Sequence, residues 1–212
     1  MNNKNIKTNN PWEEIDLNAY EKHMSLDSVF QLQTLNEMMK EQFYSYPAKS
    51  VMILGIAGGN GLEHIDKEII DKVYGVDINE NYLNICTKRY PFLQNTLETI
   101  HADLTKNTAL LPYADLLIAN LFIEYIGYEC FQRVVKQVNA KYVSCVIQIN
   151  TDVSFVSNSP YIHTFDRLDE IHSQIDEITL TDSMSQIGYT KIVHTEMELP
   201  NGKKLVRADY TI

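Results

Sequence analysis

The stretch from Val51 to Gly61 constrains the fold of this chain more than any other segment. Its sequence, Val-Met-Ile-Leu-Gly-Ile-Ala-Gly-Gly-Asn-Gly, carries an apolar run into a glycine-rich turn, and Leu62, Ile65 and Ile69 follow at helix-like spacing. This pattern predicts a buried strand, a loop and then a helix. Glycines let a backbone approach a ligand closely, and a helix start presents unpaired N–H groups. We therefore expect an anionic or carboxylate-bearing ligand at this turn.

A second apolar stretch, from Lys72 to Asp77, ends in an acid. An acid at the tip of a second parallel strand is well placed to accept hydrogen bonds from ribose hydroxyls. Asp77 could instead cap the following helix, although Asn79 suits that role. Together with the glycine-rich turn, this acid predicts a site for a nucleoside-containing cofactor.

The composition narrows the class of protein. A chain of 212 residues with 44% apolar and 22% charged residues is typical of one soluble globular domain. The net charge of −10 disfavours a nucleic-acid partner, and no apolar run is long enough to cross a membrane. Cys86, Cys130 and Cys145 are far apart and odd in number, which favours reduced thiols and a cytoplasmic location.

After Pro47, strand-like and helix-like segments alternate, which predicts a parallel sheet with right-handed crossovers. The expected strands cover residues 50–56, 72–77, 97–101, 114–120 and 142–149. The expected helices cover residues 11–45, the segment that begins at Asn79, residues 123–138 and residues 165–187, the last ending at Gly188.

The end of the chain breaks this alternation. Pro200-Asn-Gly202 lies between two alternating runs, Tyr189–Leu199 and Lys203–Ile212. Asn-Gly in that context is a strong hairpin signal. We therefore expect a mostly parallel sheet that finishes with an antiparallel hairpin.

In this order, the motifs resemble those of the class I S-adenosylmethionine-dependent methyltransferases. Gly55-x-x-x-Gly59-x-Gly61 resembles the loop that cradles the methionine part of the cofactor. Asp77 matches the acid that binds ribose, Asp103 the acid that meets adenine, and Asn120 the strand end beside the transferred methyl group. The C-terminal hairpin matches the family's reversed seventh strand.

The resemblance implies an α/β fold: a Rossmann-like, seven-stranded, mostly parallel sheet with helices on both faces and a C-terminal antiparallel hairpin. Within the family, the chain looks like the small bacterial stand-alone enzymes with an N-terminal helical lid, because Tyr20-Glu-Lys-His-Met24 is similar to a segment of that lid. The implied organisation is a flexible tail over residues 1–10, a lid over residues 11–45 and a methyltransferase domain over residues 46–212.

The same resemblance implies S-adenosylmethionine as the cofactor. The contacts it implies come from the motif residues and the lid: Gly55, Ile56, Ala57, Gly58, Gly59, Gly61, Asp77, Ile78, Asp103, Leu104, Asn120, Leu121 and Tyr20. Taken singly, Asp103 could be an ordinary loop acid, and Asn120 could bond its own turn.

Two positions depart from the family pattern. The family often has an acid two residues before the first glycine, where this chain has Ile53, and Ala57 replaces the second glycine. The loss of a charged hydrogen bond to the cofactor's ammonium group is worth roughly 1.5–3 kcal/mol, so binding weakens without disappearing. Ala57 is a small change if its φ angle is negative.

No catalytic dyad is evident in the sequence. His23 and Tyr125 are the candidates for catalytic contacts, against the alternatives of a half-buried helix residue and a core tyrosine. The histidines and cysteines show no ligand spacing, so we expect no metal site. A sulfonium methyl group is already activated, so positioning and exclusion of water are enough for many acceptors.

The expected activity is methyl transfer to a small-molecule acceptor. Relatives that methylate nucleic acids or glutamine show Asn-Pro-Pro-Tyr after strand four, whereas this chain has Asn120-Leu-Phe-Ile123. A nicotinamide-dependent oxidoreductase is a rival, but its Gly-x-Gly-x-x-Gly pattern fails in the run Gly55-Ile-Ala-Gly-Gly-Asn60. A non-catalytic, cofactor-binding regulatory module is the second alternative, and the departure at Ile53 motivates it.

Overall fold

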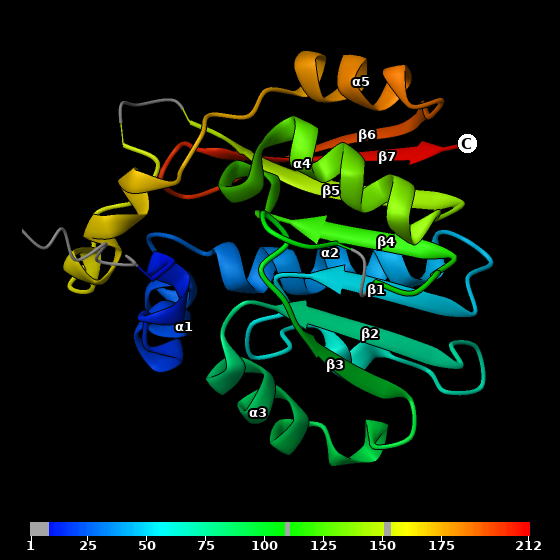
Figure 1. Cartoon of the computed structure of the whole chain (residues 1–212). Helices are drawn as coiled ribbons and strands as arrows, with labels where there is room; N and C mark the ends of the chain where they lie inside the picture. Colours follow the sequence, from blue (N-terminus) through cyan, green and yellow to red (C-terminus); the bar gives the residue numbers. More distant parts are fainter. Residues whose placement is uncertain (1–8, 109–110, 151–153) are drawn as a thin grey trace, which may run out of the picture.

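A computed structural model describes residues 9–108, 111–150 and 154–212. Within these residues, seven strands form one sheet in the order β3-β2-β1-β4-β5-β7-β6 (Figure 1). All neighbouring pairs are parallel except the two that involve β7. The strands are β1 (Ser50–Leu54), β2 (Lys72–Asp77), β3 (Leu97–His101), β4 (Leu116–Asn120), β5 (Tyr142–Ile149), β6 (Thr190–Glu198) and β7 (Lys204–Thr211). The predicted mostly parallel sheet with a terminal hairpin is confirmed.

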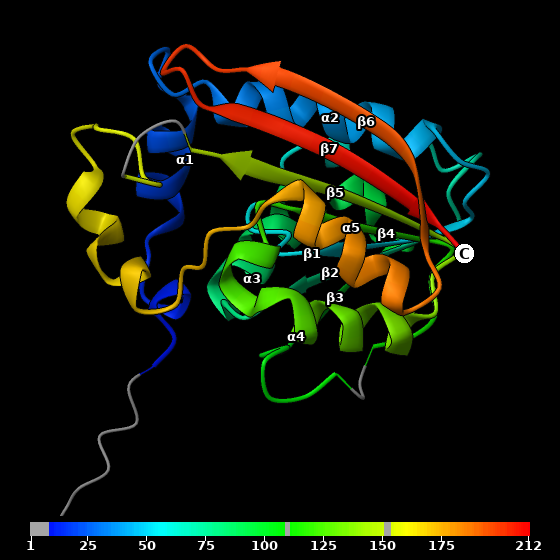
Figure 2. The ribbon, with the colours of Figure 1, turned by 90° about the horizontal axis from the view of Figure 1, so that it is seen from above.

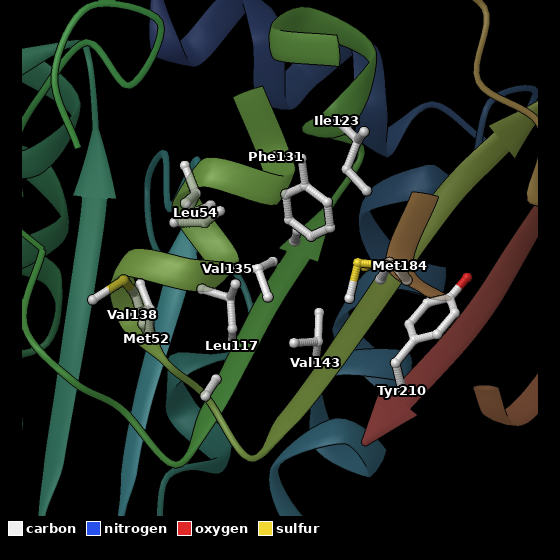
Figure 3. Packing of buried hydrophobic residues seen from close by; sticks show 14 of the residues in the cluster. Met52, Leu54, Leu117, Ile123, Phe131, Val135, Val138, Val143, Met184 and Tyr210 are labelled. Carbon is white, nitrogen blue, oxygen red and sulfur yellow. The ribbon is translucent and has the colours of Figure 1, made fainter. Parts of the chain in front are cut away.

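Helices cover both faces of the sheet, because alternate residues of each central strand face opposite layers (Figure 2). In β1, Met52 and Leu54 belong to a core shared with α4 (Ile123–Val138) and α5 (Glu177–Gln186). Figure 3 shows how α4 packs on the strands within this core. The neighbouring β1 residues, including Ile53, face a second core formed with α2 (Gln31–Tyr44) and α3 (Glu80–Arg89).

The prediction of a helix after the glycine-rich turn is wrong. The chain forms only the short 3-10 turn η2 (Leu62–His64) there, and Ile69 remains 42% exposed. The reason is that α2 already occupies this layer. A Cβ atom added at Gly61 would lie 2.9 Å from Cβ of Met39, so the turn and α2 are in direct contact. Phe43 of α2 is fully buried in the core that a crossover helix would otherwise fill.

The region before the sheet is helical, as expected, but its two α-helices lie in different parts of the fold. Both views put α1 (Leu17–Ser25) at the carboxyl edge of the parallel strands, beside the 3-10 helix η4 (Ile162–Glu170) (Figures 1 and 2). The short η1 (Pro11–Glu13) precedes α1, and Asp16 caps α1 by accepting a hydrogen bond from the N–H of Ala19 at 3.0 Å. In contrast, α2 belongs to the core. The division of the chain at residue 45 stays a prediction.

The single helix expected over residues 165–187 is replaced by two elements. The 3-10 helix η4 ends at Glu170, and α5 begins after Asp176, which caps it by accepting from the N–H of Thr179 at 2.8 Å. Between them, the N–H of Ser173 donates to the carbonyl of Glu124 at 2.7 Å, which draws this segment onto the start of α4. Gly188, with φ of +91°, follows α5 as expected.

Candidate functional site

The carboxyl ends of β1, β2, β3 and β4 meet at a cleft that encloses about 700 Å³ of space. This is the edge at which open parallel sheets bind ligands. Trp12 of η1 and Tyr20 of α1 are among its lining residues, so the N-terminal segment contributes to its wall. The predicted site residues among its lining are Tyr20, Gly55, Ala57, Asp77, Ile78, Asp103, Leu104, Asn120 and Leu121.

Asp77 joins the glycine-rich turn to the end of β2. Its two carboxylate oxygens accept hydrogen bonds from the N–H of Ala57 and the N–H of Asn79, each at 2.9 Å. Asn79 caps α3, as expected. Burial raises the pKa of Asp77 above its usual value, and these backbone hydrogen bonds oppose the rise. The residue is therefore a candidate ribose ligand that also holds the turn in place.

The turn has a left-handed backbone at Gly55, Ala57, Gly59 and Gly61, and the first two of these line the cleft. Gly55 has φ of +66°, and a Cβ atom there would lie 2.6 Å from the ring of Phe122. Ala57 has φ of +48°, whereas alanine replaces glycine easily only where φ is negative. The change from glycine to alanine at this position is therefore not a small one. A hydrogen bond to Asp77 holds Ala57 in this conformation.

The other glycines of the turn do not line the cleft. A Cβ atom at Gly59 would lie 2.7 Å from the ring of Tyr90, so this position allows α3 to pack closely. Gly61 performs the same role against α2. Ile56 and Gly58 instead line a neighbouring hollow of about 520 Å³ on the other side of the turn. Whether the cofactor contacts these four residues stays a prediction.

This neighbouring hollow holds an ion pair close to Gly58. Glu21 of α1 lines the hollow, and its carboxylate pairs with the guanidinium of Arg89 on α3, with Nη2 at 2.8 Å from Oε2. Arg89 also approaches the carbonyl oxygen of Gly58 at 3.4 Å. The carboxylate of Glu21, in the N-terminal segment, thus lies in the same hollow as Ile53, the position at which the family often has an acid.

Asp103 follows β3 at the far end of the cleft. Its Oδ1 accepts hydrogen bonds from the N–H of Thr105 at 3.1 Å and from the Thr105 hydroxyl, while the ammonium of Lys106 contacts Oδ2 at 2.5 Å. Partial burial alone would raise the pKa of Asp103, but the bonds from Lys106 and Thr105 lower it below its usual value. The residue is therefore ionised at neutral pH and can accept a hydrogen bond from a ligand.

A second cavity, of about 600 Å³, adjoins the cleft. The two share four lining residues, Trp12, Tyr20, Leu121 and Tyr125. Trp12 packs edge-on against the rings of both Tyr20 and Tyr125, with ring centroids 5.6 and 5.0 Å apart. This aromatic group is the boundary between the cleft and the second cavity.

Both catalytic candidates lie in this second cavity. Tyr125 lines both spaces, and burial raises its pKa well above the usual value, so it is neutral. His23 lies 2.8 Å from the hydroxyl of Ser159 through Nδ1, and its ring centroid is 4.7 Å from that of Phe165. Burial, with a smaller effect of the Lys203 charge, lowers the pKa of His23 to about 4. A catalytic role for either residue stays a prediction.

Sequence reasoning missed three residues of the site. Trp12 precedes the first α-helix in a polar stretch, and Gln42 lies on the stripe of α2, where nothing marked it as the partner of Asn120. Glu124 carries the one available signal, because it is an acid inside the apolar stripe of α4, in the first turn of the helix that follows β4. Its side chain is only 5% exposed and lines the second cavity.

The described residues give two further results. Among residues 9–108, 111–150 and 154–212, no three histidine, cysteine, aspartate or glutamate side chains gather in a way that could hold a metal ion. In the same part of the chain, none of the helices combines the length and apolar character that a bilayer crossing requires.

Comparison with known proteins agrees with the observed topology. No family model and no curated protein sequence matches the chain. Among solved structures, the methyltransferase domain of bacterial CtHen1-C superposes with a TM-score of 0.61 at 17% identity, covering 93% of this chain and 99% of that one. The N-methyltransferase NodS from Bradyrhizobium japonicum, in complex with S-adenosyl-L-homocysteine, gives 0.62 at 12% identity and covers 92% and 97%.

The [4+2]-cyclase SpnF gives a TM-score of 0.63 at 9% identity, covering 84% of this chain and 80% of that one. Such low identities establish architecture and leave the reaction to be argued from the site. The superpositions extend over most of the chain and so include the seven-stranded sheet with its reversed β7. The chain therefore has the class I S-adenosylmethionine-dependent methyltransferase fold.

Proposed function

We propose that this protein transfers a methyl group from S-adenosylmethionine to a small-molecule acceptor. The observation that carries the proposal is the position of Asp77 at the end of β2, bonded to the glycine-rich turn that follows β1. In this fold, an acid at that place faces the cleft where a nucleoside binds. The ends of β3 and β4 supply Asp103 and Asn120 to the same cleft.

The residues present fit the cofactor. Asp77 would bind the ribose hydroxyls, and Asp103 with Leu104 would meet the adenine. The amino acid end would lie beside Gly58, where the carboxylate of Glu21 offers a partner for an ammonium group. We infer that Glu21 replaces the acid that the family often has at the position of Ile53.

The chain itself has to orient the acceptor and exclude water. When bound, the cofactor supplies a methyl group already activated by its sulfonium. Trp12, Tyr20 and Tyr125 line the boundary of the cleft and the second cavity, so they are placed to align an acceptor and to keep water away. The neutral His23 is available as a hydrogen-bonding group or weak base in the same cavity.

A small acceptor is favoured over a macromolecule on two grounds. The space next to the cofactor cleft is a cavity of about 600 Å³ lined by α1, η4 and the start of α4, which suits a compact molecule. The net charge of −10 works against the approach of a nucleic-acid backbone. The net charge gives no preference among small molecules, so the chemical class of the acceptor has to be inferred from the residues that line the cavity.

Calorimetry tests the cofactor directly. We expect S-adenosylmethionine and S-adenosylhomocysteine to bind, and NAD to give no heat. Binding of NAD without binding of either sulfur compound would refute the proposal and favour an oxidoreductase. Production of S-adenosylhomocysteine in the presence of a panel of small acceptors then tests turnover.

A second candidate is a protein that binds the cofactor without methyl transfer. The residue Ile53 favours it, because a weakened hold on the amino acid end matters less when no methyl group has to be aligned. The similarity to a [4+2]-cyclase also extends the range of reactions found on this fold. Cofactor binding without turnover over a broad panel of acceptors would support this alternative.

A further inference from the structure

The second cavity contains a buried carboxylate oxygen without a partner. Glu124 lies in the first turn of α4, and its Oε1 accepts a hydrogen bond from the N–H of Gln148 at 3.1 Å. Its Oε2 is buried and has no hydrogen-bond partner in the described part of the chain. Leaving a buried acceptor unpaired costs free energy, and more so for a charged one. Such a group in a cavity indicates a place for a ligand.

The neighbouring polar groups of the cavity are, by contrast, bonded to one another. Gln31 donates to Gln148, Gln148 donates to Asn150 at 2.6 Å, and Asn150 donates to Gln174 at 2.9 Å. Gln148 also donates to the carbonyl of Phe155 at 2.9 Å. This chain of amides fixes the cavity wall and leaves Oε2 of Glu124 as the group that needs a donor.

The remaining walls favour a cation over an anion. Aromatic rings of Trp12, Tyr20, Tyr125, Phe155 and Phe165 line the cavity, and the described lining residues include no lysine or arginine. Aromatic faces attract organic cations, and a carboxylate pairs with them. An anionic group would meet the charge of Glu124 with no compensating cation in the described lining.

We propose that this cavity binds the methyl acceptor as an organic amine, with its protonated nitrogen donating to Oε2 of Glu124 and its carbon skeleton between the aromatic walls. The protonated nitrogen has no lone pair, so in this assignment it anchors the acceptor and is not the atom that receives the methyl group. The inference rests on the proposed function in taking the cavity as the acceptor site. It adds the chemical class of the acceptor and the residue that recognises it.

The charge on Glu124 depends on pH. Burial raises the pKa of its carboxyl to about 7, against the lowering effect of backbone hydrogen bonds. Burial lowers the pKa of His23 and, despite the opposing effect of Asp169, that of His172. The Lys203 ammonium, which donates to the carbonyl of Phe155 at 2.9 Å, lowers both pKa values further. The other groups near Glu124 are Tyr125 on its own helix, Tyr20 on α1 and Cys145 on β5, and burial raises the pKa of all three. Between pH 6 and 8, amine affinity therefore rises with pH as Glu124 ionises.

Three matched pairs of probes test this assignment: benzylamine and benzyl alcohol, phenethylamine and 2-phenylethanol, and tryptamine and tryptophol. Binding is measured by ligand-detected NMR and calorimetry, with and without S-adenosylhomocysteine. We expect at least one amine to bind more tightly than its alcohol, and Glu124→Gln to weaken that amine by about tenfold to a hundredfold. The exposed Glu129→Gln, on the same helix, is the matched control and should change nothing.

The outcomes separate the two proposals. An amine preference that survives Glu124→Gln, or no preference in any pair, overturns the assignment of Glu124. Tighter binding of carboxylate analogues overturns it as well, as does binding of Mn²⁺ at Glu124 in place of amines. Failure of S-adenosylhomocysteine to bind, with the amine preference intact, instead refutes the proposed methyl transfer. Because Glu124→Gln removes a buried charge without changing the side-chain shape, loss of folding is not expected, and circular dichroism verifies this.

Discussion

The side-chain amides of Gln42 and Asn120 hold each other by two hydrogen bonds, 2.9 Å from Gln42 Nε2 to Asn120 Oδ1 and 2.8 Å in the reverse direction. Gln42 comes from α2 and is fully buried, whereas Asn120 ends β4 at the cleft. The same amide of Gln42 donates to the hydroxyl of Ser144 at 2.8 Å, which in turn bonds to the buried Asp209. The end of β4 is thus fixed by α2, which packs on the face of the sheet opposite to α4.

Replacing Gln42 by alanine should destabilise the protein by about 1–3 kcal/mol, because Asn120 and Ser144 each lose a buried partner. Urea unfolding measures the change. The exposed Gln94→Ala provides the control and should stay within about 0.5 kcal/mol of the parent. Equal stability of the two variants would mean that the amide pair contributes little.

Asp77→Asn should weaken binding of S-adenosylmethionine by about 1.5–3 kcal/mol, the range for a charged hydrogen-bonding partner. Asparagine keeps the size of the side chain but loses one of the two acceptor oxygens, of which one bonds to Ala57 in the turn and the other to Asn79. Calorimetry measures the affinity, and the exposed Asp71→Asn is the matched control. An unchanged dissociation constant would show that Asp77 is not the ribose ligand.

Glu21→Gln should weaken only the binding of the amino acid end of the cofactor and leave the binding of its nucleoside end unchanged. We expect about tenfold weaker binding of S-adenosylmethionine, and unchanged binding of methylthioadenosine, which lacks the amino acid end. The exposed Glu37→Gln should affect neither ligand. Equal loss for both ligands would place Glu21 in a purely structural role, as the partner of Arg89.

The stability of the protein should depend on pH through Glu124. Its pKa is about 7 in the folded protein and about 4.5 when unfolded. Because the folded state raises this pKa, the contribution to stability is complete below pH 4.5 and is lost as pH rises through 7. Unfolding of the parent and of Glu124→Gln, compared from pH 5 to pH 8, should diverge by about 3 kcal/mol, with the parent losing stability. A constant difference between them would mean that Glu124 titrates normally.

Two N-terminal truncations should behave differently. Deletion of residues 1–27 removes η1 and α1 but spares α2, so we expect cooperative unfolding to persist while cofactor affinity falls. Deletion of residues 1–45 also removes Met39 and Phe43 from the core, and each buried large side chain is worth roughly 2–5 kcal/mol. We expect that shorter protein not to fold cooperatively. Thermal melts decide the matter, and equal melting of both truncations would show that α2 is part of a detachable lid.

The spacing of apolar residues and the turn-forming residues between them predicted most of the fold. Continuous apolar runs marked the buried strands β4 and β5, and Asn201-Gly202 marked the hairpin, because both signals are local. The segment after Gly61 was mistaken for a helix because Leu62, Ile65 and Ile69 have the right spacing. Spacing does not record that α2, a distant segment, already fills the layer.

The same limit applies to the site. Asp77 and Asp103 follow strands, so their positions at the cleft could be predicted from order along the chain. Glu21 and Gln42 act through partners 68 and 78 residues away in sequence, Arg89 and Asn120. No local pattern encodes such pairs. The unpartnered oxygen of Glu124 likewise results from how the surrounding amides pair, which only the folded chain decides.

Without a crossover helix after β1, the connection from Gly55 to Asp71 is held to the core by a few buried side chains, Leu62, Ile65 and Ile70, and the stretch from Asp66 to Ile69 between them is exposed. Insertions and deletions in a natural lineage are tolerated where few core contacts are lost, and here Ile69 near the end of this connection is already exposed. Related chains should therefore vary most in length between Asp66 and Ile69, next to an unchanging turn. In this protein, the freedom to change length is confined to a short exposed stretch behind the turn.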